Sequence, residues 1–313
     1  MKAIGGYFEL ELANKKHYYP KMLNLNTGRN AFEYILESYN IQNIYMPYFL
    51  CDVLLEPLKK RSVKITYYKI NDKFEPILNF SELKSNEFLF YINFFGLKDK
   101  FINSIPNSTN LIIDNSQAFY SQAIKDIPTF YSVRKFFGVP DGAYLAIKKK
   151  LNRELPIDNS KDRVSHLLKR IDVSAEEGYI DFKINEVKLN MNPIKQMSPL
   201  TARLLSSINY DSIRKIRIRN FKYLHKHLGK INKIKFDLGI DNVPMVYPFL
   251  SDDTNLKLKL ISNKVFVATY WPNVIDNMPE DSLEYKFAKQ LLPLPIDQRY
   301  SKKDLKKIIT LIK

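Results

Sequence analysis

Short apolar runs alternate with amphipathic stretches along the first half of the chain. The runs are rich in β-branched and aromatic residues, as strands are, and cover residues 43–46, 63–68, 87–93 and 110–113, with weaker candidates at 130–132 and 143–147. Between them, helical spacing of apolar residues predicts helices at 31–39 and 51–61 and a short one near 98–104. This alternation predicts an α/β fold with a doubly wound, mostly parallel sheet.

The second half of the chain is more charged and more helical. Residues 160–178 and 199–228 predict long helices, and residues 243–249 and 264–269 predict strands on either side of a helical stretch at 252–262. Two further helices are expected at 282–290 and 302–312. We therefore expect a large α/β domain over residues 1–230 and a small C-terminal α+β domain over residues 231–313.

The amino-acid composition limits the kinds of site that the chain can form. The 313 residues include one cysteine, Cys51, and four histidines without an HExxH pattern. A disulfide framework and a cysteine-based zinc site are thereby excluded, and we expect no metal centre. No apolar run approaches the ~20 residues that a membrane-spanning helix needs. Since the first residues also lack the apolar run of a signal peptide, we expect a cytoplasmic protein without a membrane span.

The charge raises the hypothesis of a nucleic-acid partner. The chain carries 49 Lys and Arg against 33 Asp and Glu, a formal net charge of +16. The basic residues are spread along the chain and recur at helical spacing, which indicates solvated helix faces rather than one binding surface. A basic field that attracts an anionic small molecule is the second explanation, and nucleic-acid binding is the least favoured.

A polar turn with a glycine precedes the first predicted helix. Its sequence is Asn-Thr-Gly-Arg-Asn-Ala, at residues 26–31. The first N–H groups of a helix have no partner within it and favour an anion such as a phosphate. Arg29 is a candidate for a bidentate contact to that anion. The simpler interpretation is that Thr27 or Asn26 only caps the helix.

Two further motifs follow predicted strands, where ligands bind in a doubly wound sheet. Asp114 ends one strand and is either a helix cap or a carboxylate for a buried cation. Ser132 and Lys135 lie among aromatic residues, before a turn that contains Gly138 and Gly142. A lysine in such partly apolar surroundings has a lowered pKa and can form a Schiff base. The alternative is an Arg-Lys pair on the surface.

Taken in order, these motifs resemble those of the DegT/DnrJ/EryC1/StrS family of pyridoxal-phosphate sugar aminotransferases, whose fold is that of aspartate aminotransferase (fold type I). The resemblance covers nearly the whole chain. Residues 26–36 resemble the family's SGR/SGT-x-A-L helix start, 111–117 its V-I-E-D-x-A-Q, and 132–142 its S-x-R-K-x-x-x-x-P-D-G. Weaker matches lie at residues 45–51, 190–202, 268–272 and 292–297.

The resemblance implies a role for each matching residue. Lys135 would bind pyridoxal 5′-phosphate (PLP) as a Schiff base and carry the proton between substrate and cofactor. Asp114 would keep the pyridine nitrogen protonated, and Gln117 would bind the 3′ oxygen of the ring. The phosphate would be held by Gly28, Arg29 and Ser132.

The resemblance also implies contacts with a second subunit and with the substrate, and at one position the sequence differs from the family's pattern. Asn190 or Asn192 would reach the phosphate of a neighbouring subunit, because the family's site lies at a dimer interface. Tyr270 and Trp271 would line the substrate pocket, with buried core aromatics as the alternative. Cys51 stands where the family often has the aromatic that stacks on the ring, so Phe49 or Tyr48 would take that role.

The implied activity is amino transfer from glutamate to a keto group of a nucleotide-linked sugar, with PLP and its amino form (PMP) as cofactor. The resemblance further implies that the protein is a homodimer and acts in polysaccharide or amino-sugar biosynthesis. Retention of Lys135 argues against the family's dehydratase branch, where histidine replaces the lysine. Two alternatives remain: a PLP-binding member without turnover, acting as a binding or regulatory subunit, and a basic nucleic-acid-binding protein.

Overall fold

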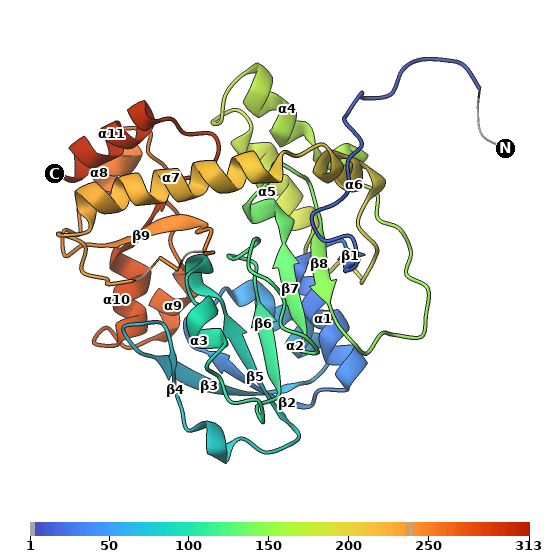
Figure 1. Cartoon of the computed structure of the whole chain (residues 1–313), viewed down its shortest axis with the longest axis horizontal. Coiled ribbons are helices and arrows are strands. Elements are labelled where there is room, and N and C mark those ends of the chain that lie inside the picture. The colour runs from blue at the N-terminus through green and yellow to red at the C-terminus, as the bar shows by residue number, and fades with distance from the viewer. Residues whose placement is uncertain (1–3, 237, 240) are drawn as a thin grey trace.

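An eight-stranded sheet forms the centre of the protein, with helices on both faces (Figure 1). The computed structural model describes residues 4–236, 238–239 and 241–313. The strand order is β1-β8-β7-β6-β5-β2-β3-β4. The strands are β1 (Leu23–Leu25), β2 (Asn43–Pro47), β3 (Lys64–Ile70), β4 (Pro76–Ile77), β5 (Glu87–Ile92), β6 (Leu111–Asp114), β7 (Thr129–Ser132) and β8 (Ala143–Ala146).

The middle of this sheet is parallel. Strands β7, β6, β5, β2 and β3 run the same way, while β8 and β4 pair antiparallel with β7 and β3 at the two sides, and β1 pairs antiparallel with β8. The predicted doubly wound, mostly parallel sheet is confirmed. All six strands expected in the first half form; β1 and β4 were not predicted.

Eleven α-helices are present in the described part of the chain: α1 (Gly28–Tyr39), α2 (Leu55–Lys60), α3 (Asp99–Ile102), α4 (Ser165–Asp172), α5 (Tyr179–Lys188), α6 (Pro199–Ser206), α7 (Tyr210–Leu228), α8 (Leu256–Ser262), α9 (Pro272–Asn277), α10 (Leu283–Gln290) and α11 (Lys302–Ile312). Helix α7 crosses the molecule, with α5 near its first half and α8 and α11 near its second (Figure 1).

Alternating side chains of the sheet enter two different cores. Phe130 of β7 and Leu145 of β8 pack into one core together with α1. Their neighbours Tyr131 and Tyr144 pack into a second core with α6 and the start of α7. Because successive strand residues point to opposite faces, a strand buried on both faces is apolar throughout, which is the pattern that made these strands recognisable.

The C-terminal part has a core of its own. Strand β9 (Val246–Leu250) pairs antiparallel with β10 (Leu291–Pro295), and both pack with α8, α11 and the second half of α7. Helices α9 and α10 instead contribute Val274 and Phe287 to the core of the large sheet. The C-terminal segment is therefore anchored on the same core that carries the sheet.

Three predicted elements differ from the structure. Residues 264–269 pair with no strand in the described chain, although Val265 and Val267 are buried and their neighbours are exposed. An extended segment against a core produces the same alternation as a strand, so the pattern could not tell them apart. The helix expected over 199–228 is two helices, because Asn209 begins α7 as a cap that accepts from the N–H of Ser212 (3.1 Å). The helix expected over 160–178 is α-helical only over α4, and helix α5 begins at Tyr179, beyond that range. Strand β10 was not predicted; it contains two prolines, which its single strand partner tolerates.

A buried carboxylate joins α10 to the large sheet, and its removal tests this anchoring. Glu284 is 1% exposed and accepts a hydrogen bond from the N–H of Ile70 at the end of β3 (2.8 Å). Glu284→Ala leaves that N–H buried without a partner, so we expect the free energy of unfolding in urea to fall by about 1–3 kcal/mol. Glu284→Gln keeps an acceptor and should recover most of the loss. A similar change for the exposed control Glu280→Ala would contradict this role.

Candidate active site

Two ionisable side chains meet at the carboxyl edge of the sheet. Asp114 is the last residue of β6 and is 5% exposed. Its carboxylate accepts a hydrogen bond from the N–H of Ser116 (2.7 Å). Lys135 closes the short 3₁₀ turn Val133–Lys135 that follows β7 and is exposed, in contrast to the partly apolar surroundings expected from the sequence. Since β6 and β7 are parallel neighbours, their ends lie at one edge, where doubly wound sheets bind ligands.

The charges of these groups influence one another. Burial raises the pKa of Asp114, while the positive charge of Lys135 and the hydrogen bonds of Ser116 lower it. Burial likewise raises the pKa of the Cys51 thiol, against the charge of Lys135, and the charge of Asp114 raises it further. Cys51 follows β2, so three strand ends contribute to one site.

The start of α1 forms the second part of the site. Thr27 caps the helix, as the simpler interpretation held: its hydroxyl accepts from the N–H of Asn30 (3.0 Å). A Cβ added at Gly28 would lie 3.5 Å from the Cβ of Ser132 and 3.7 Å from the Oγ of Ser116. Two hydroxyl groups thus flank a helix N-terminus, an arrangement that suits a phosphate. Ser116 was not predicted as a site residue, and its place two residues after Asp114 was its only signal in the sequence.

Arg29 does not have a free guanidinium for an anion. It donates to the carboxylate of Glu56 (2.7 Å), the side-chain oxygen of Asn190 (2.8 Å) and the carbonyl of Leu189 (2.9 Å). These contacts join α1 to α2 and to the segment after α5. The expectation that Arg29 clamps a phosphate is therefore not supported, because all its contacts here are structural.

The two candidate asparagines lie in the segment that follows α5. Asn190 is bound to Arg29, as described above, and the side chain of Asn192 donates to the carbonyl of Lys188 (2.7 Å). Both therefore have partners within their own chain. Their expected contact with a neighbouring subunit stays a prediction.

Gln117 is buried below the site. Its side-chain oxygen accepts from the N–H of Phe95 (2.9 Å), which leaves the NH₂ group as the donor end of the amide. Phe95 in turn stacks on Tyr270, with ring centroids 6.3 Å apart and planes inclined by 15°. Gln117 and Tyr270 are thereby linked through one aromatic ring.

The aromatic candidates separate into core and site residues. Phe49 is 0% exposed and packs against Trp271 (ring centroids 5.0 Å apart) and Phe287 (5.8 Å). This burial leaves no free ring face, so Phe49 is not supported as a cofactor contact, and Trp271 is a core aromatic as the alternative held. Tyr270 is only partly buried, and the pKa of its hydroxyl is raised by burial and by the charge of Cys51. Tyr270 therefore lies beside the site.

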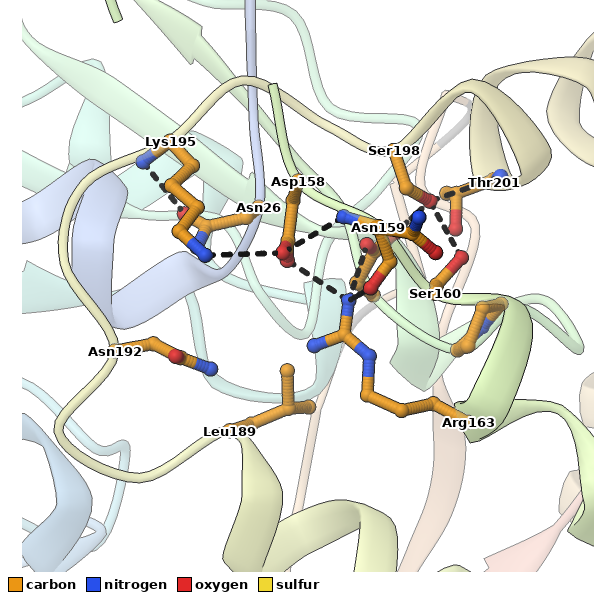
Figure 2. Close-up of polar contacts among 12 residues, drawn as sticks. Asn26, Asp158, Asn159, Ser160, Arg163, Leu189, Asn192, Lys195, Ser198 and Thr201 are labelled. Atoms are coloured by element: carbon orange, nitrogen blue, oxygen red, sulfur yellow. Dashed lines mark hydrogen bonds and ion pairs between the residues drawn. The ribbon is translucent and has the colours of Figure 1, made fainter. Parts of the chain in front are cut away.

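A buried ionic network connects Arg163, Asp158 and Lys195 (Figure 2), and it reaches the end of the lysine loop at Asp141. Arg163 donates to the carboxylates of Asp158 (2.8 Å) and Asp141 (3.0 Å), and Lys195 reaches Asp158 from the other side (3.4 Å). Asp141 also accepts from the hydroxyl of Ser198 (3.1 Å). The network joins the Pro-Asp-Gly end of the lysine loop to residues 158–163 and 195–198. Lys195 thus has a structural ion-pair partner.

Glycine is required where this loop enters β8. Gly142 has a φ of +110°, and an added Cβ would lie 2.7 Å from a methyl group of Val133. Its N–H donates to the carbonyl of Asn26 (2.6 Å), just before α1. The close approach of these backbones brings the lysine loop next to the helix start. Gly138, by contrast, has an ordinary φ and no such close contact.

Removal of Arg163 tests the network. The variant Arg163→Met leaves the buried carboxylate of Asp141 without its cation and Asp158 with Lys195 alone, and we expect it to lower the free energy of unfolding by about 3–5 kcal/mol in urea titrations. Lys161→Ala, which breaks the exposed pair of Lys161 with Asp162, should change it by less than about 1 kcal/mol. Equal stability of the two variants would contradict the structural role of Arg163.

Within the described residues, no group of three or more His, Cys, Asp or Glu side chains is arranged to hold a metal ion. The described helices include none with the length and apolar character needed to cross a membrane.

Solved structures with the same fold are known. No protein-family model matches the sequence, and no curated protein matches it. DesV of S. venezuelae, in complex with a ketimine intermediate, has a TM-score of 0.66 at 15% identity, over 93% of this chain and 83% of DesV. The putative sugar aminotransferase Spr1654 of Streptococcus pneumoniae, in its PLP form, has a TM-score of 0.65 at 14% identity, over 94% and 86%.

A third similar structure carries another activity in its name. GDP-4-keto-6-deoxymannose-3-dehydratase (ColD) has a TM-score of 0.63 at 10% identity, over 93% of this chain and 88% of its own. Identities this low report on the fold. The chain therefore has the fold that these sugar aminotransferases share with the dehydratase, as the sequence motifs predicted.

Proposed function

We propose that the protein is a PLP-dependent aminotransferase that transfers an amino group from glutamate to a keto group of a nucleotide-linked sugar. The observation that carries the proposal is the convergence of Lys135, Asp114 and a phosphate-suited helix start at one edge of the sheet. The similar structures support it, since Spr1654 has been solved in both a PLP form and a PMP form.

The residues present fit the cofactor. The hydroxyls of Ser116 and Ser132 with the N-terminus of α1 at Gly28 suit its phosphate, and the buried carboxylate of Asp114 suits a protonated ring nitrogen. The NH₂ end of Gln117 suits an oxygen of the ring. Cys51, rather than Phe49, is the residue we assign to the face of the ring. When bound, PLP supplies an electron sink for the carbanion formed at the substrate.

The side chains would perform two tasks around that chemistry. The Nζ of Lys135 would bind the cofactor and afterwards move a proton at the substrate carbon, which requires an amine that is neutral for part of the cycle. Asp114 would face the protonated ring nitrogen; burial raises the pKa of its carboxyl, while the charge of Lys135 and the hydrogen bonds of Ser116 lower it. Its fixed negative charge holds the proton on the ring nitrogen.

The presence of Lys135 favours amino transfer over dehydration. The ColD structure has the same fold, so the fold itself does not separate the two reactions. A lysine at this position can return a proton to the substrate carbon, which completes amino transfer. The histidine of the dehydratase branch does not provide this amine.

The substrate and assembly belong to the same proposal. A homodimer with a shared site would bring Asn190 or Asn192 toward the partner's phosphate, and Tyr270 would line the substrate pocket. Residues 1–230 and 231–313 would act as the large and small domains of a cytoplasmic enzyme of polysaccharide or amino-sugar biosynthesis.

The second candidate is a cofactor-binding protein without turnover. It is favoured by one observation, the structural engagement of Arg29 at a position expected to bind phosphate. Both candidates predict cofactor binding at Lys135 but differ in their response to glutamate.

Covalent labelling tests the assignment of Lys135. The purified protein is incubated with PLP and reduced with borohydride, which fixes an imine irreversibly, and its peptides are analysed by mass spectrometry. We expect one modified peptide, labelled at Lys135, and visible yellow colour before reduction. Lys135→Ala should lose both, and Lys195→Ala, a lysine in a structural ion pair, should retain both. Labelling spread over surface lysines would contradict the proposal.

Glutamate separates turnover from simple binding. The colour of the PLP-loaded protein should bleach on addition of glutamate, with release of 2-oxoglutarate. Asp114→Asn removes the charge that holds the ring proton, so this step should slow by a factor on the order of 100 or more. The exposed control Asp126→Asn should leave the rate unchanged. A coloured protein that does not respond to glutamate would instead favour the second candidate.

A further inference from the structure

Three helices in the second half of the chain hold most of its net charge. Helices α7, α8 and α11 contain twelve Lys and Arg residues, two Asp and no Glu, so they carry ten of the sixteen net positive charges. In the sequence these residues indicate separate solvated helix faces. In the fold, however, α11 packs against both α7 and α8, which brings the three faces together (Figure 1).

The basic residues of α7 lie on the side of the helix away from the core. Four of them are exposed and recur every three or four residues: Lys215, Arg219, Lys222 and Lys226. This spacing places them on one face of the helix. Phe221, Leu224 and Leu228 lie on the opposite face and enter the core of the C-terminal part. The four cations therefore form one row that points outward.

Helix α11 joins this row to α8. The ammonium group of Lys302 lies over the ring of Tyr223 on α7 (5.4 Å to the centroid). Lys307 donates to the carbonyl of Asn263, the residue that caps the end of α8 (2.7 Å). The exposed lysines of the two helices are Lys259, Lys302, Lys303, Lys306 and Lys307. Together with the row on α7 they form a cationic surface of nine exposed side chains.

The described chain supplies no carboxylate partner for this cationic surface. None of its nine side chains forms an ion pair there, whereas Arg214, Lys264 and Arg299 close by do. Of the two aspartates in these helices, Asp304 accepts from the N–H (2.8 Å) and the hydroxyl (2.7 Å) of the preceding cap residue. Asp211 lies in the first turn of α7, at the end away from α11. Unpaired like charges held together in this way attract an anionic partner.

Large apolar side chains border the cationic surface at α8. Leu258 is 68% exposed, Phe266 57% and Ile261 36%. The chain turns directly after α8, where the N–H of Val265 donates to the carbonyl of Leu260 (2.9 Å), so Phe266 stays beside the end of the helix. Exposed apolar groups next to lysines are typical of surfaces that bind the interface of a membrane.

We infer that the cationic surface docks the protein on a bilayer that contains anionic lipids, with Leu258 and Phe266 entering the region between headgroups and acyl chains. Eight of the nine cations are lysines, which act as point charges toward a diffuse negative surface, whereas paired hydrogen bonds to single phosphates favour arginine. A nucleic acid would use the charges but has no apolar region for Leu258. A bilayer uses both features. The inference goes beyond the proposed catalytic function and does not depend on it.

Co-sedimentation of the full chain with lipid vesicles tests this docking. We expect binding to vesicles of equimolar phosphatidylcholine and phosphatidylglycerol, but none to vesicles of phosphatidylcholine alone, and added salt should weaken it. Each basic residue near such a surface contributes about fivefold to the affinity. A triple variant with Lys222→Gln, Lys303→Gln and Lys306→Gln should therefore bind on the order of 100-fold more weakly.

The control removes the same charge elsewhere. The triple variant Lys84→Gln, Lys100→Gln and Lys125→Gln changes exposed lysines outside these helices and should bind nearly as the wild type does. Phe266→Ser tests the apolar part and should weaken vesicle binding about tenfold. All the substituted side chains are exposed and lie outside the candidate active site, so melting temperature and PLP colour should stay those of the wild type.

Three outcomes would overturn the inference. The first is a wild-type protein that does not bind the anionic vesicles, and the second is equal binding by the two triple variants. The third is binding of a single-stranded DNA oligonucleotide that needs the same three lysines but not Phe266, without binding to vesicles, which would assign the surface to a nucleic acid. Because PLP colour and vesicle binding are measured separately, failure of the proposed catalytic function would leave this test intact.

Discussion

The buried carboxylate of Asp114 at the end of β6 is the interaction on which the site depends. Burial alone would favour its neutral form, and only the charge of Lys135 and the hydrogen bonds of Ser116 act against this. The sheet places Lys135 and Ser116 near Asp114, because β7 runs parallel to β6 and ends beside it. Displacement of the lysine loop would therefore raise the pKa of Asp114 further.

Much of the remaining structure serves to keep that loop in place. Asp141, at the end of the loop, accepts hydrogen bonds from Arg163 and Ser198. The N–H of Gly142 donates to the carbonyl of Asn26, just before α1. The helix start is tied in turn to α2 and to the segment after α5 through Arg29. Arg29, which the sequence predicted as a ligand contact, is thus part of the frame that holds the reactive groups.

The sequence predicted the fold better than it predicted these roles. Strands buried on both faces appear as continuous apolar runs, so β2, β3, β5 and β6 were recognisable from pattern alone. Asp114 and Lys135 were recognisable because each ends or follows such a strand. The partners of Arg29 and Arg163 were not, since Asn190 and Asp141 are distant in sequence and only the folded chain brings them near. Phe49 was expected to stack on the cofactor but lies in the core, because a run of aromatic residues does not reveal which ring enters the core.

A crystal structure of the protein grown with PLP tests the central claim most directly. The account predicts continuous electron density from the Nζ of Lys135 to the cofactor, the ring nitrogen within hydrogen-bond distance of the Asp114 carboxylate, and the phosphate between Gly28, Ser116 and Ser132. Cofactor density that is not joined to Lys135, or a phosphate placed away from Gly28, Ser116 and Ser132, would contradict it.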